Sequence, residues 1–292
     1  MYKMAQRTFS LGFDDERPYG ALASTPQGKT FREEKLAFVR KMHERFDVAN
    51  IPRTHFILTS YLEAARNDVG TTLLRDVYPK KNDLLDLQQH SHTHGIVEPL
   101  SGVNRPVMKA DEYTDDIAHA STLMSDILDV QVRGLRTPYG YEKDFSHRPD
   151  VLSGLRKAGI TFVSSDLGMK DTLAGAVTKE RQPHSYRDAG FPDIVEVPAH
   201  GLQDVVYTKE KAKQLFGKEE APSADEAFRH YDHVLNQAME IEAERVSIAL
   251  CLHPWAVMEY DPELELLLKI SESARQKGFE ILSYGQVSDK YR

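Results

Sequence analysis

One local pattern constrains the fold of this chain more than any other. An amphipathic helix ends at a residue that tolerates left-handed backbone, and a short apolar strand follows. Residues 150–158 predict such a helix, Gly159 ends it, and residues 160–164 continue as a strand. The pattern returns around Gly278 and, more loosely, around Asn50. A helix, a left-handed stop and a buried strand form the repeating unit of a parallel sheet.

Apolar periodicity predicts further elements of the same kind. Helices are expected over residues 31–46 and 111–128, and another is expected to begin with Ser60 as its N-cap. The remaining expected strands cover residues 7–13, 55–58, 84–89, 134–136, 194–197 and 247–252. About seven strands alternate with helices, and no linker-like change of composition interrupts them, so one α/β domain is expected.

Three histidines, His90, His92 and His94, follow the expected strand 84–89 within five residues. A short histidine-rich tract is typical of a metal site, because a neutral imidazole offers a lone pair to the ion. Two geometries are open at this point. In an extended chain His90 and His92 share a face, whereas in a helical turn His90 and His94 come within about 6 Å of each other.

Polar residues directly follow most of the expected strands. They are Asp14-Asp15, the histidine cluster, Arg136 with Thr137-Pro138-Tyr139-Gly140, Asp166, and His253. In α/β barrels the carboxyl ends of the strands converge on one mouth, so these side chains are expected to share a site. Adjacent carboxylates repel each other unless a cation compensates, which also favours a metal near Asp14 and Asp15.

These segments resemble, in order, the motifs of the polysaccharide deacetylase (NodB-homology, carbohydrate esterase family 4) superfamily. The resemblance rests on Phe13-Asp14-Asp15, His90-Ser91-His92-Thr93-His94, Arg136-Thr137-Pro138-Tyr139-Gly140 and His253, and it spans Phe13 to about Trp255. Three features depart from the family pattern. The tryptophan that the family usually has near its fourth motif is absent around residues 166–170. Glu16 stands where the family usually has glycine, and Cys251 stands where it usually has leucine.

The resemblance implies a distorted (β/α)7 TIM-like barrel, with one catalytic domain over residues 1–292. It also implies a divalent metal held by Asp15, His90 and His94, with His92 left out. A carboxylate and two imidazoles suit Zn²⁺ best, with Co²⁺, Fe²⁺, Mn²⁺ or Ni²⁺ as alternatives, and three protein ligands leave a position open for water.

Catalytic roles are implied by the same resemblance. Asp14 would be the general base, Arg136 would orient it, and Asp166 would brace Arg136. His253 would protonate the departing amine, and the backbone N–H of Tyr139 would stabilise the oxyanion.

The expected activity is hydrolysis of amide C–N bonds, foremost the N-deacetylation of an N-acetylated carbohydrate. An allantoinase-like or cyclic-imide hydrolase acting on small amides is the alternative. Two further alternatives are a His-x-His amidohydrolase, in which His90 and His92 bind the metal, and a non-catalytic carbohydrate-binding protein. Trp255 and Tyr19 are candidate walls of a sugar site.

Charge and cysteine content exclude several classes of protein. A net charge of −8 without a clustered Lys/Arg stripe argues against nucleic-acid and membrane partners. The single Cys251 excludes an intrachain disulfide, and no secretory signal is visible near residue 1, so a cytoplasmic location is expected. The irregular region 200–223 predicts a solvated insertion or a lid over the site. The oligomeric state is left open.

Overall fold

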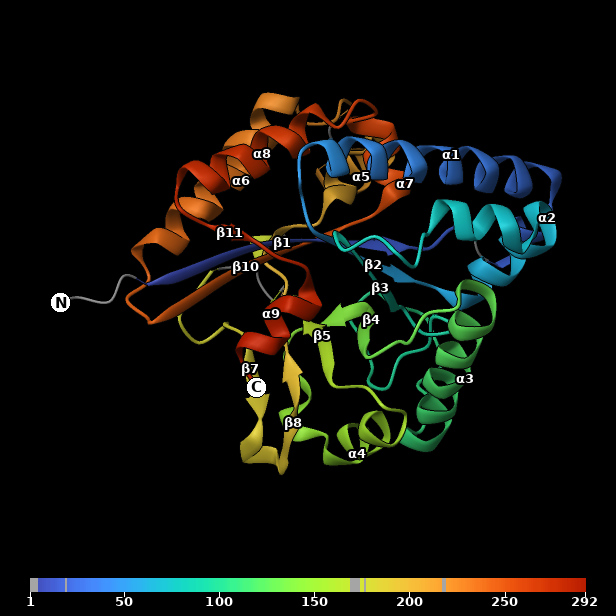
Figure 1. Ribbon diagram of the computed structural model, residues 1–292, viewed down its shortest axis with the longest axis horizontal. Coiled ribbons are helices and arrows are strands. Elements are labelled where there is room, and N and C mark those ends of the chain that lie inside the picture. Colours follow the sequence, from blue (N-terminus) through green and yellow to red (C-terminus); the bar gives the residue numbers. More distant parts are fainter. Residues whose placement is uncertain (1–4, 19, 169–173, 176, 217–218) are drawn as a thin grey trace.

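Seven parallel strands lie side by side in the computed structural model, which describes all residues except 1–4, 19, 169–173, 176 and 217–218 (Figure 1). Their order is β10 (Arg245–Leu252), β1 (Gln6–Asp15), β2 (Arg53–Ile57), β3 (Leu85–Gln89), β4 (Gly134–Tyr141), β5 (Phe162–Asp166) and β8 (Phe191–Glu196). The short strands are β7 (His184–Tyr186), antiparallel to β8; β11 (Glu280–Ile281), paired with β1; and β6 (Ala174–Gly175), paired with β9 (Gly201–Leu202). This is the predicted distorted (β/α)7 barrel.

The barrel is distorted because β8 and β10 do not pair as strands in the described part of the chain. His200, just beyond β8, bridges the gap instead. Its N–H donates to the carbonyl of Ala249 in β10 at 2.7 Å, and its Nδ1 accepts the Ala249 N–H at 3.3 Å. Burial lowers the pKa of His200 to about 4, so the ring is neutral and Nδ1 can accept.

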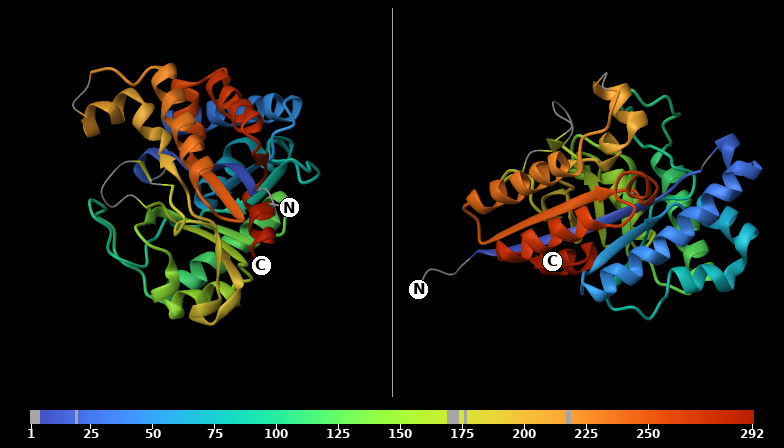
Figure 2. Two further views of the ribbon diagram at one scale, coloured as in Figure 1. Left: turned by 90° about the vertical axis from the view of Figure 1, so that its left-hand side faces the viewer. Right: turned by 90° about the horizontal axis from the view of Figure 1, so that it is seen from above.

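Helices cover the outside of this sheet. They are α1 (Pro26–Val48), α2 (Thr59–Val77), α3 (Ala110–Leu128), α4 (Pro149–Lys157), α5 (Lys209–Phe216), α6 (Ala224–Glu240), α7 (Pro254–Tyr260), α8 (Glu265–Gln276) and α9 (Tyr284–Lys290). Helices α1 to α4 follow one another around the outer face, each in contact with the next (Figure 1). Figure 2 shows β1 and β10 running side by side, and α6 packs against α8 beside them.

The predicted left-handed stops occur where the sequence placed them. Gly159, Gly278 and Asn50 have φ values of 78°, 83° and 51°. Each follows a helix and precedes a strand, so the chain reverses in a few residues and the strand enters the sheet parallel to its predecessor. Glycine fits because it has no Cβ to clash in this conformation.

Several element boundaries differ from the prediction, among them the starts of α1 and α2. Helix α1 begins at Pro26 rather than at residue 31, because Thr25 caps it by accepting the Gly28 N–H at 3.1 Å and proline is tolerated in a first helical turn. Ser60 lies inside α2, which begins at Thr59 without a side-chain cap. Pro26 and Gly28 therefore lie in the first turn of α1 and not in a loop.

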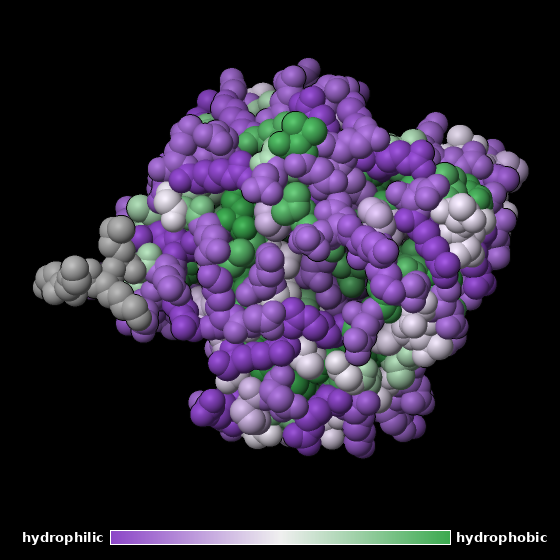
Figure 3. Space-filling model, viewed as in Figure 1, coloured by the Kyte–Doolittle hydropathy of each residue, from purple (hydrophilic) through white to green (hydrophobic). Residues whose placement is uncertain are grey.

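The described surface carries few large apolar side chains. The face in Figure 3 is mostly hydrophilic, and among the residues that the structure describes the exposed large hydrophobic ones are Leu22, Val48, Val107 and Met239. Among the described helices, none combines the length and the apolar character needed to cross a bilayer.

Candidate metal and catalytic site

The chain turns sharply after β3, and the turn brings two histidines together. Ser91 and His94 adopt left-handed backbone, with φ values of 67° and 60°, and Ser91 Oγ accepts the His94 N–H at 3.2 Å. The Nε2 atoms of His90 and His94 lie 3.2 Å apart, and both side chains are buried. Of the two geometries that the sequence left open, the turn is the one that forms.

Asp116 in α3 holds this turn, and His92 points away from it. The Asp116 carboxylate accepts the backbone N–H groups of His92 and Thr93 at 2.9 and 3.1 Å. The His92 ring packs against His119, with centroids 4.6 Å apart, and its Nδ1 lies 3.1 Å from the Thr59 hydroxyl. His92 therefore lies outside the cluster, as the family resemblance implied.

Glu16 supplies the carboxylate that faces the two histidines. Its Oε2 lies 2.7 Å from His94 Nε2 and 3.7 Å from His90 Nε2. The candidate ligand atoms of Glu16, His90 and His94 all lie within 4.8 Å of one another, and all three side chains are buried. These three residues form the candidate metal centre.

Asp15, the predicted third metal ligand, does not join this cluster. Its carboxylate accepts from His55 Nδ1 at 2.5 Å and from the Tyr78 hydroxyl at 2.9 Å. Successive side chains of a strand point to opposite faces, so within β1 Asp14 faces the pocket and Asp15 the other side. Glu16, the residue directly after β1, also lines the pocket. The two aspartates of the motif are therefore separated: Asp14 faces the pocket, and Asp15 lies in the layer beneath α1 and α2.

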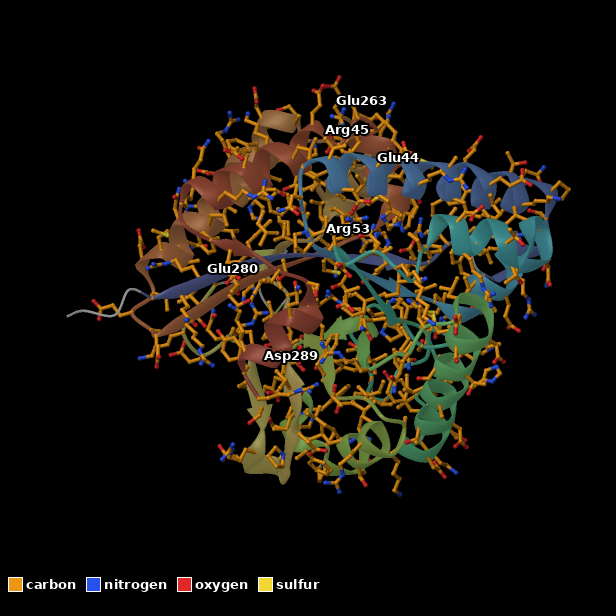
Figure 4. The ribbon with its side chains drawn as sticks, viewed as in Figure 1. Glu44, Arg45, Arg53, Glu263, Glu280 and Asp289 are labelled. Atoms are coloured by element: carbon orange, nitrogen blue, oxygen red, sulfur yellow. The ribbon has the colours of Figure 1, made fainter. Side chains whose placement is uncertain are left out.

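The layer that receives Asp15 is itself polar and buried. His43 lies 4.8 Å from the His55 ring, edge to face, and accepts from Arg53 Nε at 3.1 Å. Arg53, labelled beneath α1 in Figure 4, also pairs with Asp47 at 2.6 Å. Asp15 has its own hydrogen-bonding partners here, and a metal is not needed to compensate its charge.

The donor chemistry of the candidate metal centre fits a divalent cation. A carbonyl oxygen can only accept, so His90 Nδ1 must donate to the Arg136 carbonyl at 2.9 Å. The lone pair of a neutral His90 then lies on Nε2, which faces His94 and Glu16. Burial lowers the pKa of His94, against the opposing effect of Glu16, and this favours a neutral ring there as well. Two imidazole nitrogens and a carboxylate are a zinc-type donor set.

Asp14 and Arg136 form a second buried group beside this centre. Arg136 Nε lies 3.6 Å from Asp14 Oδ1, and Cys251 Sγ donates to Asp14 Oδ2 at 3.3 Å. Arg136 also donates from Nη2 to the Tyr284 hydroxyl at 2.7 Å. Burial raises the pKa of Cys251 well above its ordinary value, so the thiol keeps its proton.

Three polar atoms of this group have no hydrogen-bond partner in the described part of the chain. They are Asp14 Oδ1 and the Nε and Nη1 of Arg136, and all three are buried. Buried polar groups are normally satisfied, by protein atoms or by water. Because both residues line the pocket, a small polar molecule bound there would satisfy them.

His253 approaches the centre from the end of β10 and is held by Asp204. Its Nδ1 donates to Asp204 Oδ1 at 2.8 Å, and its backbone N–H donates to Oδ2 at 2.6 Å. Its Nε2 lies 3.9 Å from Glu16 Oε1. Burial opposes the charge on His253, but the carboxylate of Asp204 outweighs it and raises the pKa of His253 to about 9.

Asp204 also corrects the prediction for residues 200–223. This region is not wholly a solvated insertion, because it contains β9, the 3-10 helix η4 (Asp204–Tyr207) and α5, and the Asp204 side chain is fully buried. Gln203 and Val205 line the pocket. A closing motion of this segment stays a prediction.

Asp166 does not brace Arg136, contrary to the predicted role. It pairs with Arg181 at 3.2 Å and accepts the Gly168 N–H at 2.8 Å. Among the residues that the structure describes, Tyr284 occupies the place beside Arg136 that was predicted for Asp166. Gly12 in β1 makes this possible, because a Cβ there would lie 2.6 Å from the Tyr284 ring.

The Arg-x-Pro-Tyr-Gly segment distorts β4 where it reaches the pocket. The register with β5 shifts between Arg136 and Tyr141, and Tyr139 has a φ of 62°. The Tyr139 ring lies 4.6 Å from the His94 ring, edge to face. The oxyanion role of the Tyr139 N–H stays a prediction. Tyr19 lies outside the described residues.

One pocket of about 250 Å³ unites these groups. Its lining residues are Asp14, Glu16, Arg17, His90, His94, Arg136, Thr137, Tyr139, Gly140, Leu167, Gln203, Val205, Cys251, His253 and Trp255. The predicted residues Asp14, His90, His94, Arg136, Tyr139 and His253 thus lie together, whereas Asp15 and Asp166 do not line the pocket.

Comparison with known proteins supports the fold. No protein-family model matches the chain, and no curated protein sequence matches it either. A solved structure of a Mycobacterium smegmatis protein assigned as a polysaccharide deacetylase matches with a TM-score of 0.65 and 15% identity, covering 99% of this chain and 91% of that one. The polysaccharide deacetylase Bc1974 from Bacillus cereus matches with a TM-score of 0.51 and 14% identity, covering 96% and 92%. The fold is that of the polysaccharide deacetylases.

The polysaccharide deacetylase fold does not by itself identify a substrate. The structure of Puue allantoinase matches with a TM-score of 0.61 and 12% identity, covering 98% of this chain and 89% of that one. Proteins named for different substrates therefore share this architecture, and the substrate must be argued from the pocket.

Three site residues were missed by reasoning from the sequence. Glu16 directly follows Asp14-Asp15, but it lies just beyond β1, and the sequence gives no signal for the turn in which its N–H donates to the Asp14 carbonyl at 3.0 Å. Asp204 and Tyr284 gave no local signal. Asp204 lies in an irregular segment and Tyr284 at the start of a late helix, so only the tertiary fold brings them to His253 and Arg136.

Proposed function

We propose that this protein is a metal-dependent hydrolase of amide C–N bonds. The observation that carries the proposal is the convergence of three buried groups on one pocket, namely the Glu16, His90 and His94 cluster, the Asp14–Arg136 pair and the His253–Asp204 pair. A donor cluster, a base and an acid around one cavity are the parts that hydrolysis by an activated water requires.

Glu16, His90 and His94 would hold the divalent ion. The donor set favours Zn²⁺, with Co²⁺, Fe²⁺, Mn²⁺ or Ni²⁺ as alternatives. An ion bound there would supply Lewis acidity toward the amide oxygen and would lower the pKa of a bound water.

Asp14 acts as the general base in this proposal. Its Oδ1, which lacks a hydrogen-bond partner among the described residues, would take the proton of the attacking water. Arg136 Nε lies 3.6 Å from this oxygen, and Tyr284 holds the guanidinium in place.

His253 acts as the general acid. A pKa of about 9 keeps its ring protonated at neutral pH. Because Asp204 accepts from Nδ1, the second N–H, on Nε2, is the one that would protonate the departing nitrogen. The Tyr139 N–H is the proposed backbone donor to the oxyanion.

The leading substrate class is an N-acetylated carbohydrate, which the likeness to deacetylase structures supports. The pocket volume favours a second class, the small or cyclic amides. At about 250 Å³ the pocket is smaller than the roughly 300–1,000 Å³ of sites for drug-sized ligands. One sugar ring or one ureide ring fits this volume better than a polymer does.

The test uses protein stripped of metal by a chelator and reloaded with Zn²⁺, Co²⁺ or Mn²⁺. Acetate release is measured from N-acetylglucosamine and chito-oligomers, and ring opening is measured with allantoin, hydantoin and succinimide. Metal-dependent hydrolysis of either set supports the proposal and selects the substrate class. Binding of sugars without hydrolysis of any amide or ester would instead favour a carbohydrate-binding protein.

Two variants separate the base from the metal centre. Asp14→Asn is expected to lower kcat by about 10²–10⁴-fold, because general base catalysis contributes that much, while bound metal stays near one ion per chain. His90→Ala is expected to lose both metal and activity. Full activity of Asp14→Asn would show that the base is another residue.

A further inference from the structure

A second group of metal-binding side chains lies in the same pocket, beside the candidate metal centre. Asp14, Cys251 and His253 each offer one possible ligand atom, these atoms all lie within 4.8 Å of one another, and all three side chains are buried. All three also line the pocket. The described residues form two such groups, and the two groups share no side chain.

The ends of two neighbouring strands bring this second group together. Asp14 lies near the end of β1 and Cys251 near the end of β10, and the two strands pair in parallel up to Leu252. His253 directly follows β10 and precedes α7. Cys251 Sγ donates to Asp14 Oδ2 at 3.3 Å. The register of the sheet therefore fixes the group, which is not a chance meeting of surface side chains.

Each member of the group has an atom that could bind an ion. Asp14 Oδ1 is buried and has no hydrogen-bond partner among the described residues. The bond from His253 Nδ1 to Asp204 keeps the proton on that nitrogen, so the lone pair of a neutral ring lies on Nε2. A carboxylate behind the ring is the usual support of a metal-bound histidine. The Cys251 thiol becomes a ligand when its proton passes to solvent.

The charges around the group act in both directions. The carboxylate of Asp14 attracts a cation, and Glu16 Oε1 lies only 3.9 Å from His253 Nε2. Arg136 opposes a cation, because its Nε lies 3.6 Å from Asp14 Oδ1. Binding would also displace one proton from the Cys251 thiol and one from the His253 ring. A second ion is therefore expected to bind more weakly than the first, so the candidate metal centre fills first.

Sulfur, nitrogen and oxygen in one group select a particular class of ion. A thiolate favours zinc-like cations, whereas Mg²⁺ and Mn²⁺ prefer oxygen ligands. We propose that Asp14, Cys251 and His253 form a second, inhibitory site for Zn²⁺ or a similar thiophilic divalent cation. The ion occupies the carboxylate of the base and the imidazole of the acid, so hydrolysis stops. The inhibition rests on the proposed function, whereas the site itself does not.

Cobalt titration tests the site without any substrate. Wild-type protein is stripped of metal by a chelator, kept reduced and titrated with Co²⁺. The chain has a single cysteine, Cys251, so a thiolate-to-cobalt charge-transfer band in the near ultraviolet reports on this residue alone. The band is expected to grow after the first equivalent, and equilibrium dialysis is expected to give two ions per chain. No band at any excess of Co²⁺, or one ion per chain, overturns the second site.

Two variants test the ligand set. Asp14→Asn is expected to raise the Co²⁺ concentration at half-maximal band by at least about tenfold, because even groups that only orient ligands account for about 10–100-fold in metal affinity. Asp144→Asn, outside the pocket, is the matched control and should leave that concentration unchanged. Cys251→Ser keeps a donor toward Asp14 and is expected to bind one ion per chain. An unchanged Co²⁺ dependence in Asp14→Asn overturns the ligand set.

Inhibition is measured with the amide that zinc-loaded protein hydrolyses. Raising Zn²⁺ from one equivalent to a large excess is expected to lower wild-type kcat/KM by about 10²-fold or more, because a general base and a general acid each contribute about 10²–10⁴-fold. Cys251→Ser is expected to keep most of its own one-equivalent activity, and excess Mg²⁺ should not inhibit the wild type. Wild-type hydrolysis that excess Zn²⁺ leaves undiminished overturns the inhibitory role.

Failure of the proposed function has a separate signature. If metal-reloaded protein hydrolyses none of the amides, the cobalt band alone decides the site. A band that grows with the second ion and needs Asp14 supports the site without the activity, and its absence overturns the site.

Discussion

At the scale of single residues, Asp204 determines the pH range over which His253 carries a proton that it could donate in the pocket. Asp204 is fully buried and raises the pKa of His253 to about 9, well above the ordinary 6.5. Protonation of His253 therefore stabilises the folded state fully below about pH 6.5, and this contribution is lost as the pH rises through about 9. Activity that needs the protonated ring falls over the same upper range.

Asp204→Asn is expected to lower the pKa of His253 toward its ordinary value, because the amide carries no charge. The descending limb of kcat/KM against pH should move from near pH 9 toward pH 6.5. The measurement is a pH profile of zinc-loaded protein. An unchanged descending limb would show that Asp204 does not control the acid.

A second His–Asp pair provides the control for this change. His184 Nε2 lies 2.8 Å from Asp144, and the hydrogen bond to Asp144 raises the pKa of His184 to about 9 despite burial. Neither residue lines the pocket. Asp144→Asn should therefore change the pH dependence of stability without moving the pH profile of activity.

At the scale of elements, the site depends on two local geometries. Strand alternation in β1 sends Asp14 into the pocket and Asp15 into the layer beneath α1 and α2, and the turn directly after β1 brings Glu16 to the pocket as well. The turn after β3 brings His90 to His94, and Asp116 from α3 holds that turn through two backbone N–H groups. An error of one residue in either geometry would remove a candidate metal ligand.

Asp116→Ala is expected to weaken metal binding without removing any ligand. Loss of the carboxylate leaves two N–H groups of the turn unsatisfied, and groups that orient ligands typically account for about 10–100-fold in metal affinity. Competition with a chelator gives the Kd for Zn²⁺. Asp115→Ala, an exposed neighbour on the same helix, should leave that Kd unchanged.

At the scale of the whole molecule, the alternation of helices with parallel strands could be predicted, because helical periodicity and the left-handed stops Gly159 and Gly278 are local signals. The contact between the two ends of the sheet could not be predicted. It depends on His200, just beyond β8, which hydrogen-bonds to Ala249 in β10, and nothing near residue 200 in the sequence indicates Ala249. The role of Asp204 could not be predicted for the same reason, because Asp204 lies in a segment whose charged residues predicted exposure to solvent.

The ligand set was predicted in part. His90 and His94 meet as the turn geometry required. The aspartate pair suggested that the second carboxylate binds the metal, and the structure instead assigns Asp15 to His55 and Tyr78 and Glu16 to the pocket. The central claim is therefore that Glu16, and not Asp15, completes the metal centre.

Zinc binding by a matched pair of amide variants tests this claim most directly. A ligand that binds only the folded state stabilises it by about 2.7 kcal/mol at a concentration of 100 Kd, so wild-type Tm should rise when Zn²⁺ is added to stripped protein. Asp15→Asn should retain one zinc per chain and this rise in Tm, whatever its own starting stability. Glu16→Gln should lose both. Loss of zinc in Asp15→Asn with retention in Glu16→Gln would contradict the account.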